Sequence, residues 1–121
     1  MPVEQTRTIA EVLHHHLSAF GSNDLEAILE DYSEESVILT KDGAVVGLAN
    51  IRTFFEHFFQ LIPTGSSFEM IRQELSGPVA YIAWSSESPT ASIPMGSDTF
   101  IIEKGMIRYH TVADHRILPS R

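Results

Sequence analysis

The 121-residue chain contains no cysteine, which excludes disulfide bonds, thiol nucleophiles and cysteine-based zinc sites. Basic residues are also few: 8 Lys and Arg stand against 16 Asp and Glu, for a formal net charge of −8. This deficit argues against binding of nucleic acids, whose phosphates are contacted by clustered Lys and Arg. No stretch approaches the roughly 20 apolar residues that a membrane-spanning helix requires. The opening residues, MPVEQTRTIAEV, lack the apolar core of a secretory signal, so a cytoplasmic location is expected.

Apolar side chains are plentiful by contrast. They make up 43% of the sequence, and Phe is the most frequent aromatic residue, with 7 copies against 3 Tyr and 1 Trp. This composition is enough for a sizeable core and argues against disorder. The length suits a single domain over residues 1–121. Without thiols, the chemistry of such a domain depends on carboxylates, imidazoles and hydroxyl groups.

Helical periodicity marks three segments. In residues 4–20 the apolar side chains recur at spacings of three and four and form one stripe, which Gly21 ends. Asn23 is predicted to cap a short second helix, because Glu26 three residues later would complete a capping box. Residues 49–62 are predicted to form a third helix with a wide apolar face, so we expect it to be buried on most sides.

The remaining segments are predicted to be strands. Two short runs of β-branched residues flank the turn Lys41-Asp42-Gly43 and indicate a tight hairpin before the third helix. Four further strands follow that helix, with a loop containing Pro89 and Pro94 between the second and the third of them. They are expected at Phe68–Leu75, Val79–Ser86, Ser97–Glu103 and Met106–Arg116. The order ααββαββββ predicts an α+β domain with one sheet and its helices segregated to one face.

Three weak motifs occur in succession along this order. They are GSNDLEAILEDYSEESV at the second helix and first strand, GLANIRTFFEHF at the third helix, and GMIRYHTVAD at the last strand. Together they resemble the nuclear transport factor 2-like (NTF2-like) superfamily, in its SnoaL-like and ketosteroid-isomerase-like branch, over nearly the whole chain. The resemblance implies a cone: a curved mixed or antiparallel sheet wrapped around helices and enclosing a pocket. Because this superfamily includes isomerases, dehydratases, cyclases, epoxide hydrolases and non-catalytic binding domains, the fold does not settle the function.

Two polar residues among apolar neighbours are the first candidates for catalysis. His16 lies on the stripe of the first helix, where it is either a core histidine bonded to a backbone carbonyl or part of a site. In the ketosteroid-isomerase pattern this position carries the tyrosine that donates to the developing oxyanion. Asp98 alternates with Phe100 and Ile102, and desolvation on such a face suits a carboxyl group to general acid or base work. The resemblance places Asp98 on the aspartate that stays protonated and donates to the oxyanion, and a solvated strand aspartate is the alternative.

The last strand supplies a second pair of candidates. Alternation puts Arg108, His110, Val112 and Asp114 on one face, and Ile107, Tyr109, Thr111 and Ala113 on the other. The resemblance implies that His110 and Asp114 face the wide end of the cavity. We expect their side chains to come within reach of each other, directly or through one water, as a base with its orienting carboxylate. A polar strand edge near the end of the chain is the alternative.

Four larger side chains are predicted to line the pocket and bind a ligand: Tyr32, Phe55, Trp84 and Val112. Tyr32 and Phe55 match positions whose rings line the deep pocket in the resembling proteins, while Trp84 could lie on either face of its strand. Core packing is the alternative for each aromatic residue. An apolar wall of this kind suits a flat or terpenoid-like ligand.

One position departs from the ketosteroid-isomerase pattern. Thr40 stands where that pattern has an aspartate base, and a threonine cannot act as a general base at neutral pH. Steroid isomerisation by that mechanism is therefore not expected. The sequence has no HExxH, GxSxG or glycine-rich phosphate motif, and we expect neither a metal nor an organic cofactor.

Two functions follow as hypotheses. The first is an enzyme in which Asp98, or the pair of His110 and Asp114, moves a proton next to a carbonyl or hydroxyl group of a small apolar molecule, while His16 supports the enolate oxygen. Its reaction would be an isomerisation, a dehydration or an aldol-type cyclisation. The alternative is a non-catalytic ligand-binding or dimerisation module with the same pocket.

A homodimer is expected as well. The predicted outer faces of the last two strands offer half-apolar rows, and no helix is left to cover them. These rows contain Thr99, Ile101, Ile107, Tyr109 and Thr111. The same surface joins the two subunits in the dimers that the resemblance implies.

Overall fold

The computed structural model describes residues 7–119, which form three helices and one six-stranded sheet. Along the chain the elements are α1 (Ile9–Gly21), α2 (Leu25–Leu29), β1 (Val37–Thr40), β2 (Gly43–Val46), α3 (Leu48–Leu61), β3 (Ser67–Ser76), β4 (Val79–Glu87), β5 (Ser92–Glu103) and β6 (Met106–Ile117). The predicted α+β class and the order ααββαββββ are confirmed. Residues 4–6 of the first predicted helix lie outside the described residues.

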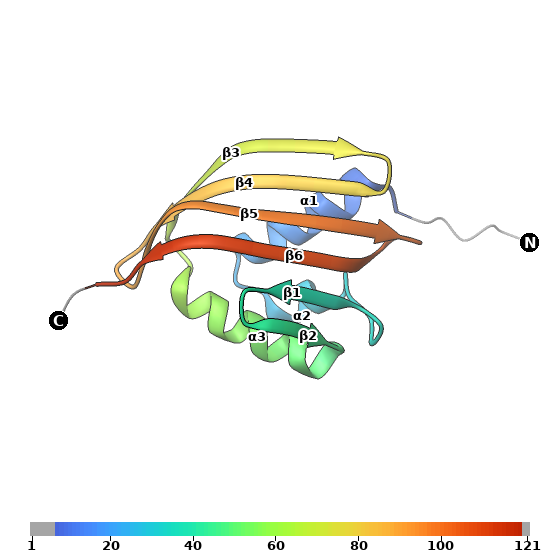
Figure 1. Cartoon of the computed structure of the whole chain (residues 1–121), viewed down its shortest axis with the longest axis horizontal. Helices are drawn as coiled ribbons and strands as arrows, with labels where there is room; N and C mark the ends of the chain where they lie inside the picture. The colour runs from blue at the N-terminus through green and yellow to red at the C-terminus, as the bar shows by residue number, and fades with distance from the viewer. Residues whose placement is uncertain (1–6, 120–121) are drawn as a thin grey trace, which may run out of the picture.

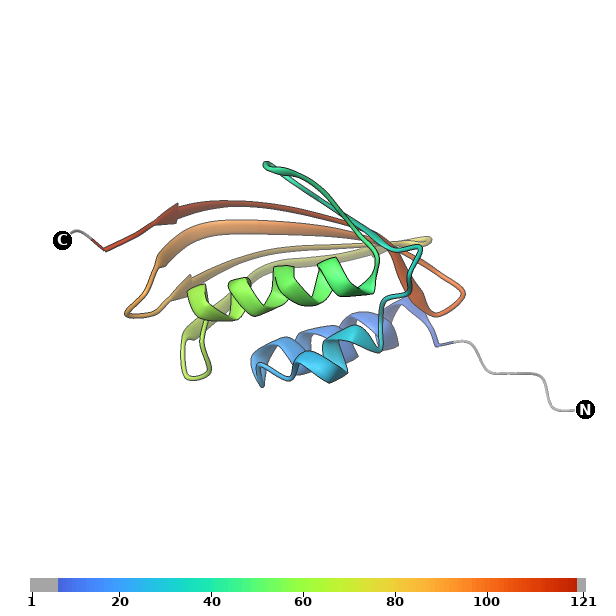
Figure 2. The ribbon, with the colours of Figure 1, turned by 90° about the horizontal axis from the view of Figure 1, so that it is seen from below.

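The sheet is mixed and curved. Its strand order is β2-β1-β6-β5-β4-β3, in which β1 runs parallel to β6 and every other neighbouring pair is antiparallel. The four long strands β3 to β6 lie side by side, and the β1–β2 hairpin extends the sheet beyond β6 (Figure 1). All three helices cover the same face, and the described residues place no helix over the opposite one (Figure 2). This cone is the NTF2-like architecture that the motifs predict.

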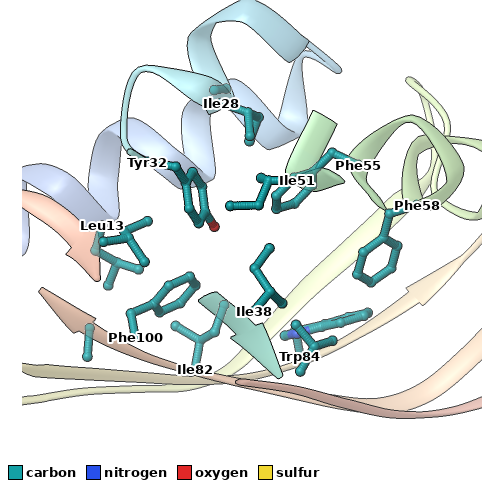
Figure 3. Close-up of a cluster of buried hydrophobic side chains, with 14 of the residues drawn as sticks. Leu13, Ile28, Tyr32, Ile38, Ile51, Phe55, Phe58, Ile82, Trp84 and Phe100 are labelled. Atoms are coloured by element: carbon teal, nitrogen blue, oxygen red, sulfur yellow. The ribbon is translucent and has the colours of Figure 1, made fainter. Parts of the chain in front are cut away.

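The core lies between the helices and the inner face of the sheet. Figure 3 shows Phe55 and Phe58 of α3 across from Phe100 and Trp84 of the sheet, with Tyr32 entering from the segment after α2. Phe100 is 0% exposed and Phe55 1% exposed. Full burial of a large apolar side chain contributes about 1.5–3 kcal/mol, so this cluster accounts for much of the stability of the fold.

The cap of α2 lies one residue later than predicted. Asp24 is the N-cap, and its side chain accepts a hydrogen bond from the Ala27 amide at 3.1 Å. Asn23 instead takes a left-handed conformation with φ 51°, which asparagine tolerates better than most residues. Its side-chain amide donates to the carbonyl oxygens of Phe20 and Ile62. Asn23 therefore joins the end of α1 to the end of α3.

Strand β5 begins earlier than the proline content suggests. It starts at Ser92 rather than Ser97 and so includes Pro94. The pairing with β6 is irregular between Ser92 and Met95. A proline has no amide hydrogen to donate, and a break in the ladder tolerates that loss.

Ile107 is on the wrong face in the sequence-based prediction. It is 1% exposed and belongs to the core, whereas Tyr109, two residues later, is 38% exposed. The reason is a register shift: Ile101 pairs with Tyr109, but Ile102 pairs with Ile107, which leaves Arg108 as an extra residue on β6. Such a bulge turns the side chains before it to the opposite face.

Candidate functional site

Four side chains form a continuous buried chain of hydrogen bonds, called here the buried network: Tyr32, His110, Asp98 and Trp84. The Tyr32 hydroxyl oxygen lies 2.9 Å from His110 Nδ1, and His110 Nε2 lies 2.6 Å from Asp98 Oδ2. The Trp84 indole N–H donates to Asp98 Oδ1 at 2.8 Å. Asp98 is the most exposed of the four at 7%, and His110 is the least exposed at 1%.

Strand pairing brings the network together. Asp98 of β5 is directly opposite Val112, and the next inward-facing pair is Phe100 with His110, so that Asp98 and His110 are diagonal neighbours on the inner face. On the other side, Trp84 of β4 is opposite Gly96, two residues before Asp98. The alternation predicted for Asp98 along β5 is confirmed.

The donors and acceptors available in the network determine where its protons lie. The Trp84 indole can only donate, so Asp98 Oδ1 must accept. The Tyr32 hydroxyl has no other hydrogen-bond partner in residues 7–119, so its proton is satisfied only when it is donated to His110 Nδ1. His110 is then neutral and carries its proton on Nε2, from which it donates to Asp98 Oδ2. Every donor has an acceptor when Asp98 is an ionised carboxylate.

His16 lies beside the network without joining it. It is 4% exposed, and its ring centroid lies 5.0 Å from that of Phe100 and 5.8 Å from that of His110. Its Nδ1 atom has no hydrogen-bond partner among the described residues. His16 is therefore not the core histidine bonded to a backbone carbonyl that was the alternative to a role in a site. Burial, and then the nearby His110 and His15, lower the pKa of His16 well below 6.5. The ring is therefore neutral at neutral pH.

Tyr32 is shifted in the opposite direction. Burial raises the pKa of its hydroxyl well above 10.0, and the charges of Asp98 and Asp31 add to the effect. All three causes disfavour the tyrosinate. The Tyr32 hydroxyl therefore keeps its proton, in agreement with the proton assignment of the network.

A cavity of about 690 Å³ lies between the β1–β2 hairpin, α3 and the second half of β6. Its buried wall includes Phe58 and Val112, while exposed polar residues such as Asp42, His57 and Arg116 line it as well. A volume of this size is within the usual range for small-molecule sites. The cavity thus combines an apolar inner wall with charged groups.

The network lies directly behind the apolar wall of this cavity. None of its four members lines the cavity, but Val112 does, and Val112 is the strand partner of Asp98. Phe58 lines it too, and its ring centroid lies 6.4 Å from that of Trp84. Two side chains therefore separate the cavity from the ionisable groups.

Asp114 occupies a different place from the one expected. Its carboxylate accepts two hydrogen bonds from Arg116, at 2.8 and 2.9 Å, and these raise the pKa of the Arg116 guanidinium. The carboxylate bonded to His110 is Asp98, so the expected pairing of His110 with Asp114 is wrong. Four residues along an extended strand span about 13 Å, which is too far for the two side chains to meet.

Of the four predicted ligand-binding residues, Val112 lines the cavity. Tyr32, Phe55 and Trp84 are at most 3% exposed and pack inside the core, as their alternative interpretation holds. The inner part of the cone is thus filled by the protein's own side chains, and the open space lies nearer the hairpin.

Comparison with known proteins identifies the family. A sequence model of the SnoaL-like domain matches residues 13–118. The chain belongs to the SnoaL-like family. No curated protein matches the sequence.

Solved structures agree with this SnoaL-like assignment at the level of the fold. An NTF2-like protein of unknown function from Cytophaga hutchinsonii is 13% identical, with a TM-score of 0.74 over 93% of this chain and 95% of that one. A proposed ketosteroid isomerase from Kribbella flavida is 11% identical, with a TM-score of 0.74 over 93% and 82%. A proposed polyketide cyclase from Sinorhizobium meliloti is 16% identical, with a TM-score of 0.70 over 85% and 94%. Identities this low show a shared fold and leave the activity open.

Thr40 of this SnoaL-like domain is the last residue of β1 and lines the cavity. Its hydroxyl donates to the Gly43 carbonyl and accepts from the Asp42 amide, both at 3.0 Å. The hydroxyl is thus used by the hairpin turn, in agreement with the absence of a base at this position.

Sequence reasoning overlooked two groups of residues. Asp31 is 0% exposed and binds Arg7 and His15 through its two carboxylate oxygens, each at 2.8 Å. In α3, Thr53 and His57 line the cavity. They are four residues apart and next to Phe54 and Phe58, so polar residues flanking an apolar helical stripe were the available signal.

Two kinds of feature are absent from the described part of the chain. Residues 7–119 hold no cluster of three or more His, Asp or Glu side chains with the spacing of a metal site. None of their helices has the length and hydropathy needed to cross a membrane.

Proposed function

We propose that this SnoaL-like domain is a small-molecule enzyme that transfers a proton next to a carbonyl or hydroxyl group, and that Asp98 is the group that exchanges the proton. The supporting observation is the buried network: an ionised carboxylate with two N–H donors, placed directly behind the apolar wall of a cavity of about 690 Å³. Buried ionisable groups beside a cavity are characteristic of sites that move protons.

The proposed step needs no co-reactant. Asp98 takes a proton from the carbon beside the substrate carbonyl, and the electron pair of that C–H bond forms the enolate. In an isomerisation, the proton on Asp98 returns to a different carbon of the same molecule. Dehydration and aldol-type cyclisation start from the same proton transfer.

The neighbours of Asp98 have supporting roles in this proposal. His110 and Trp84 donate to the carboxylate and hold it in place, and Tyr32 donates to Nδ1 of His110. His16 keeps its expected role as a donor to the enolate oxygen. Its Nδ1 is the one buried side-chain polar atom without a partner in the described residues, but four rings surround it, so this role requires the substrate to displace part of the inner packing.

The walls of the cavity suggest the class of substrate. Phe54, Phe58 and Val112 suit a flat aromatic or terpenoid-like body, and Asp114 with Arg116 offers hydrogen bonds to a polar end. Because Val112 and Phe58 stand between the cavity and Asp98, substrate must move at least one of them. We expect no metal or organic cofactor, and a cytoplasmic location.

Deuterium exchange tests the proposal. Small cyclic ketones such as cyclohexanone are incubated with the protein in D₂O, and exchange at the carbon beside the carbonyl is followed by NMR. We expect Asp98→Asn to lower the rate about 10²–10⁴-fold. Glu56→Gln, on the exposed side of α3, serves as the control. Equal rates for wild type and Asp98→Asn would refute the proposal.

One observation favours the alternative of a non-catalytic ligand-binding module: no network member lines the cavity, and every polar group of the network is already satisfied. In that case the same ketones would shift the Val112 methyl resonances saturably, with no exchange above the buffer rate. The two functions are thus separated in one set of samples.

We also propose that two copies join through the outer face of the sheet. An apolar row crosses five strands there. From β4 to β2, each member is the strand partner of the next, and the members are Val79, Ile101, Tyr109, Val37 and Val46. No described helix covers this row (Figure 2). A half-apolar sheet face of this kind is usually covered by another layer.

Light scattering at micromolar concentration tests the dimer. We expect a twofold mass for wild type and for Gln60→Glu, which adds a charge on α3, and a single mass for Tyr109→Glu, which adds one in the row. A monomeric wild type would refute the dimer and leave the proposed chemistry untouched.

A further inference from the structure

The indole of Trp84 lies flat against the backbone of Gly96. A Cβ atom placed on Gly96 would lie 2.4 Å from Trp84 Cζ2 and 2.5 Å from Cε2, far inside van der Waals contact. Gly96 is therefore required for close approach and not for an unusual backbone angle. Any other residue would push the indole away from the strand that carries Asp98.

Other rings hold the indole as well. The Phe68 ring stacks on it, with a centroid distance of 5.4 Å and an interplanar angle of 18°, and Phe58 packs against it at 6.4 Å. Trp84 is 3% exposed. The indole N–H therefore has a fixed direction, and the group at its end is Asp98 Oδ1, at 2.8 Å.

We propose that Trp84 is a positioning residue. Its indole packs on Gly96, and its N–H binds Asp98 Oδ1, which orients the Asp98 carboxylate and keeps it ionised, ready to act as a base. The role of Asp98 as a catalytic base rests on the proposed function, but the assignment of Asp98 as an ionised carboxylate does not. It differs from what the resemblance implies, in which the aspartate at this position stays protonated and donates to an oxyanion. A protonated Asp98 would donate a hydrogen bond to His110 Nε2, so the proton of the neutral imidazole would lie on Nδ1. Nδ1–H would then donate to the Tyr32 oxygen, and the Tyr32 hydroxyl proton would have no acceptor.

Loss of the indole N–H has a defined consequence. Asp98 would keep one N–H donor instead of two, and its negative charge would be less well stabilised. The remaining hydrogen bond, from His110 Nε2–H to Asp98 Oδ2, would then be stronger, because fewer donors share the charge of the carboxylate. The other polar groups that face His110 are His16 of α1 and Tyr32, and neither is altered by a change at Trp84.

Nitrogen-15 NMR of the full chain provides the test, since it needs no substrate. Trp84→Phe keeps an aromatic ring in the core and removes only the donor. We expect the resonance of the His110 Nε2–H proton to move downfield in this variant, because its hydrogen bond to Asp98 strengthens. Tyr81→Phe is the matched control, because it removes a polar hydrogen from the same strand on the opposite face. An unchanged His110 Nε2–H resonance in folded Trp84→Phe would show that Trp84 only packs.

A second measurement covers the case in which Trp84→Phe does not fold. Trp84 is the single tryptophan, so the protein has one indole N–H resonance. In Asp98→Asn, which removes the charge and retains the shape, we expect this proton to move upfield and to exchange faster with water. An indole resonance that stays in place would overturn the proposal.

Activity separates this inference from the proposed function. If both hold, Trp84→Phe lowers the rate of deuterium exchange while the ketone concentration for half saturation stays within about twofold. If the His110 Nε2–H resonance moves but no variant changes the exchange rate, the proposed catalysis is wrong and the positioning of Asp98 stands.

Discussion

Two aspartates of this SnoaL-like domain, Asp98 and Asp114, are on the inner face of the same sheet, and their side chains are 9% and 5% exposed, but their partners differ. Asp98 is held by residues of two other strands, 12 and 14 positions away in the sequence, and both of these residues are buried. Asp114 is held by Arg116, two residues away on its own strand, and the side chain of Arg116 is 34% exposed. Loss of either carboxylate therefore has a different cost, because the N–H groups that bind Asp98 have no access to water, whereas the guanidinium of Arg116 does.

The sharpest way to break this contrast is to truncate both aspartates. Asp98→Ala leaves the N–H groups of Trp84 and His110 unpaired in the core, and we expect a loss of about 2–6 kcal/mol, since each unpaired buried donor costs about 1–3 kcal/mol. Asp114→Ala should cost about 1 kcal/mol, because the side chain of Arg116 is 34% exposed and its guanidinium can then be solvated. Urea unfolding measures both values. Equal losses would mean that the network is not a buried, fully satisfied unit.

The neutral His16 beside His110 predicts a loss of stability in acid. Its pKa in the folded state is lowered, mainly by burial, whereas the unfolded chain has the ordinary value of 6.5. Below pH 6.5 the unfolded state therefore binds more protons than the folded state, and the free energy of unfolding falls by up to about 1.4 kcal/mol per pH unit. Urea unfolding between pH 7.5 and 5 checks the slope.

His16→Leu is the matched variant for this prediction. It removes the titrating ring and the unpartnered Nδ1 while keeping an apolar side chain, so we expect a flatter pH dependence and no loss of stability at pH 7.5. A slope as steep as that of wild type would assign the acid sensitivity to other groups.

A smaller effect is expected from Tyr32→Phe, which removes the outermost donor of the network. One lost hydrogen bond costs about 0.5–1.5 kcal/mol. The specific result is at His110, whose Nδ1 would lose its donor and change its nitrogen-15 shift, while Asp98 keeps the proton on Nε2. An unchanged Nδ1 shift would show that Tyr32 does not donate to it.

The smallest effect belongs to the cavity. Arg116→Lys keeps a positive charge beside the buried Asp114 carboxylate and removes the two-point hydrogen bonding of the guanidinium, so we expect the free energy of unfolding to change by less than about 1 kcal/mol. A loss of several kcal/mol in urea unfolding would place this pair in the same class as the network.

Much of this arrangement is predictable from local pattern. Periodicity located all three helices and all six strands, with the largest boundary errors at the start of β5, predicted at Ser97 and observed at Ser92, and at the start of α1, which is observed at Ile9 within the predicted range 4–20. The alternation of Asp98 with Phe100 correctly predicted an inward-facing carboxylate, and the stripe of α1 correctly predicted a buried His16. These are properties of residues a few positions apart, which the geometry of one helix or one strand determines.

The partners of these residues were not predictable in the same way. The sequence by itself determined which side chains would face inward, because periods of 3.6 and 2 operate within a single element. Only the tertiary structure decided that His110 binds Asp98 and not Asp114, and that Trp84 donates to the same carboxylate. It also decided, through one extra residue at Arg108, that Ile107 is in the core. The physical reason is that partners are selected by strand register and bulges, which bring together residues as far apart as Tyr32 and His110, 78 positions along the chain.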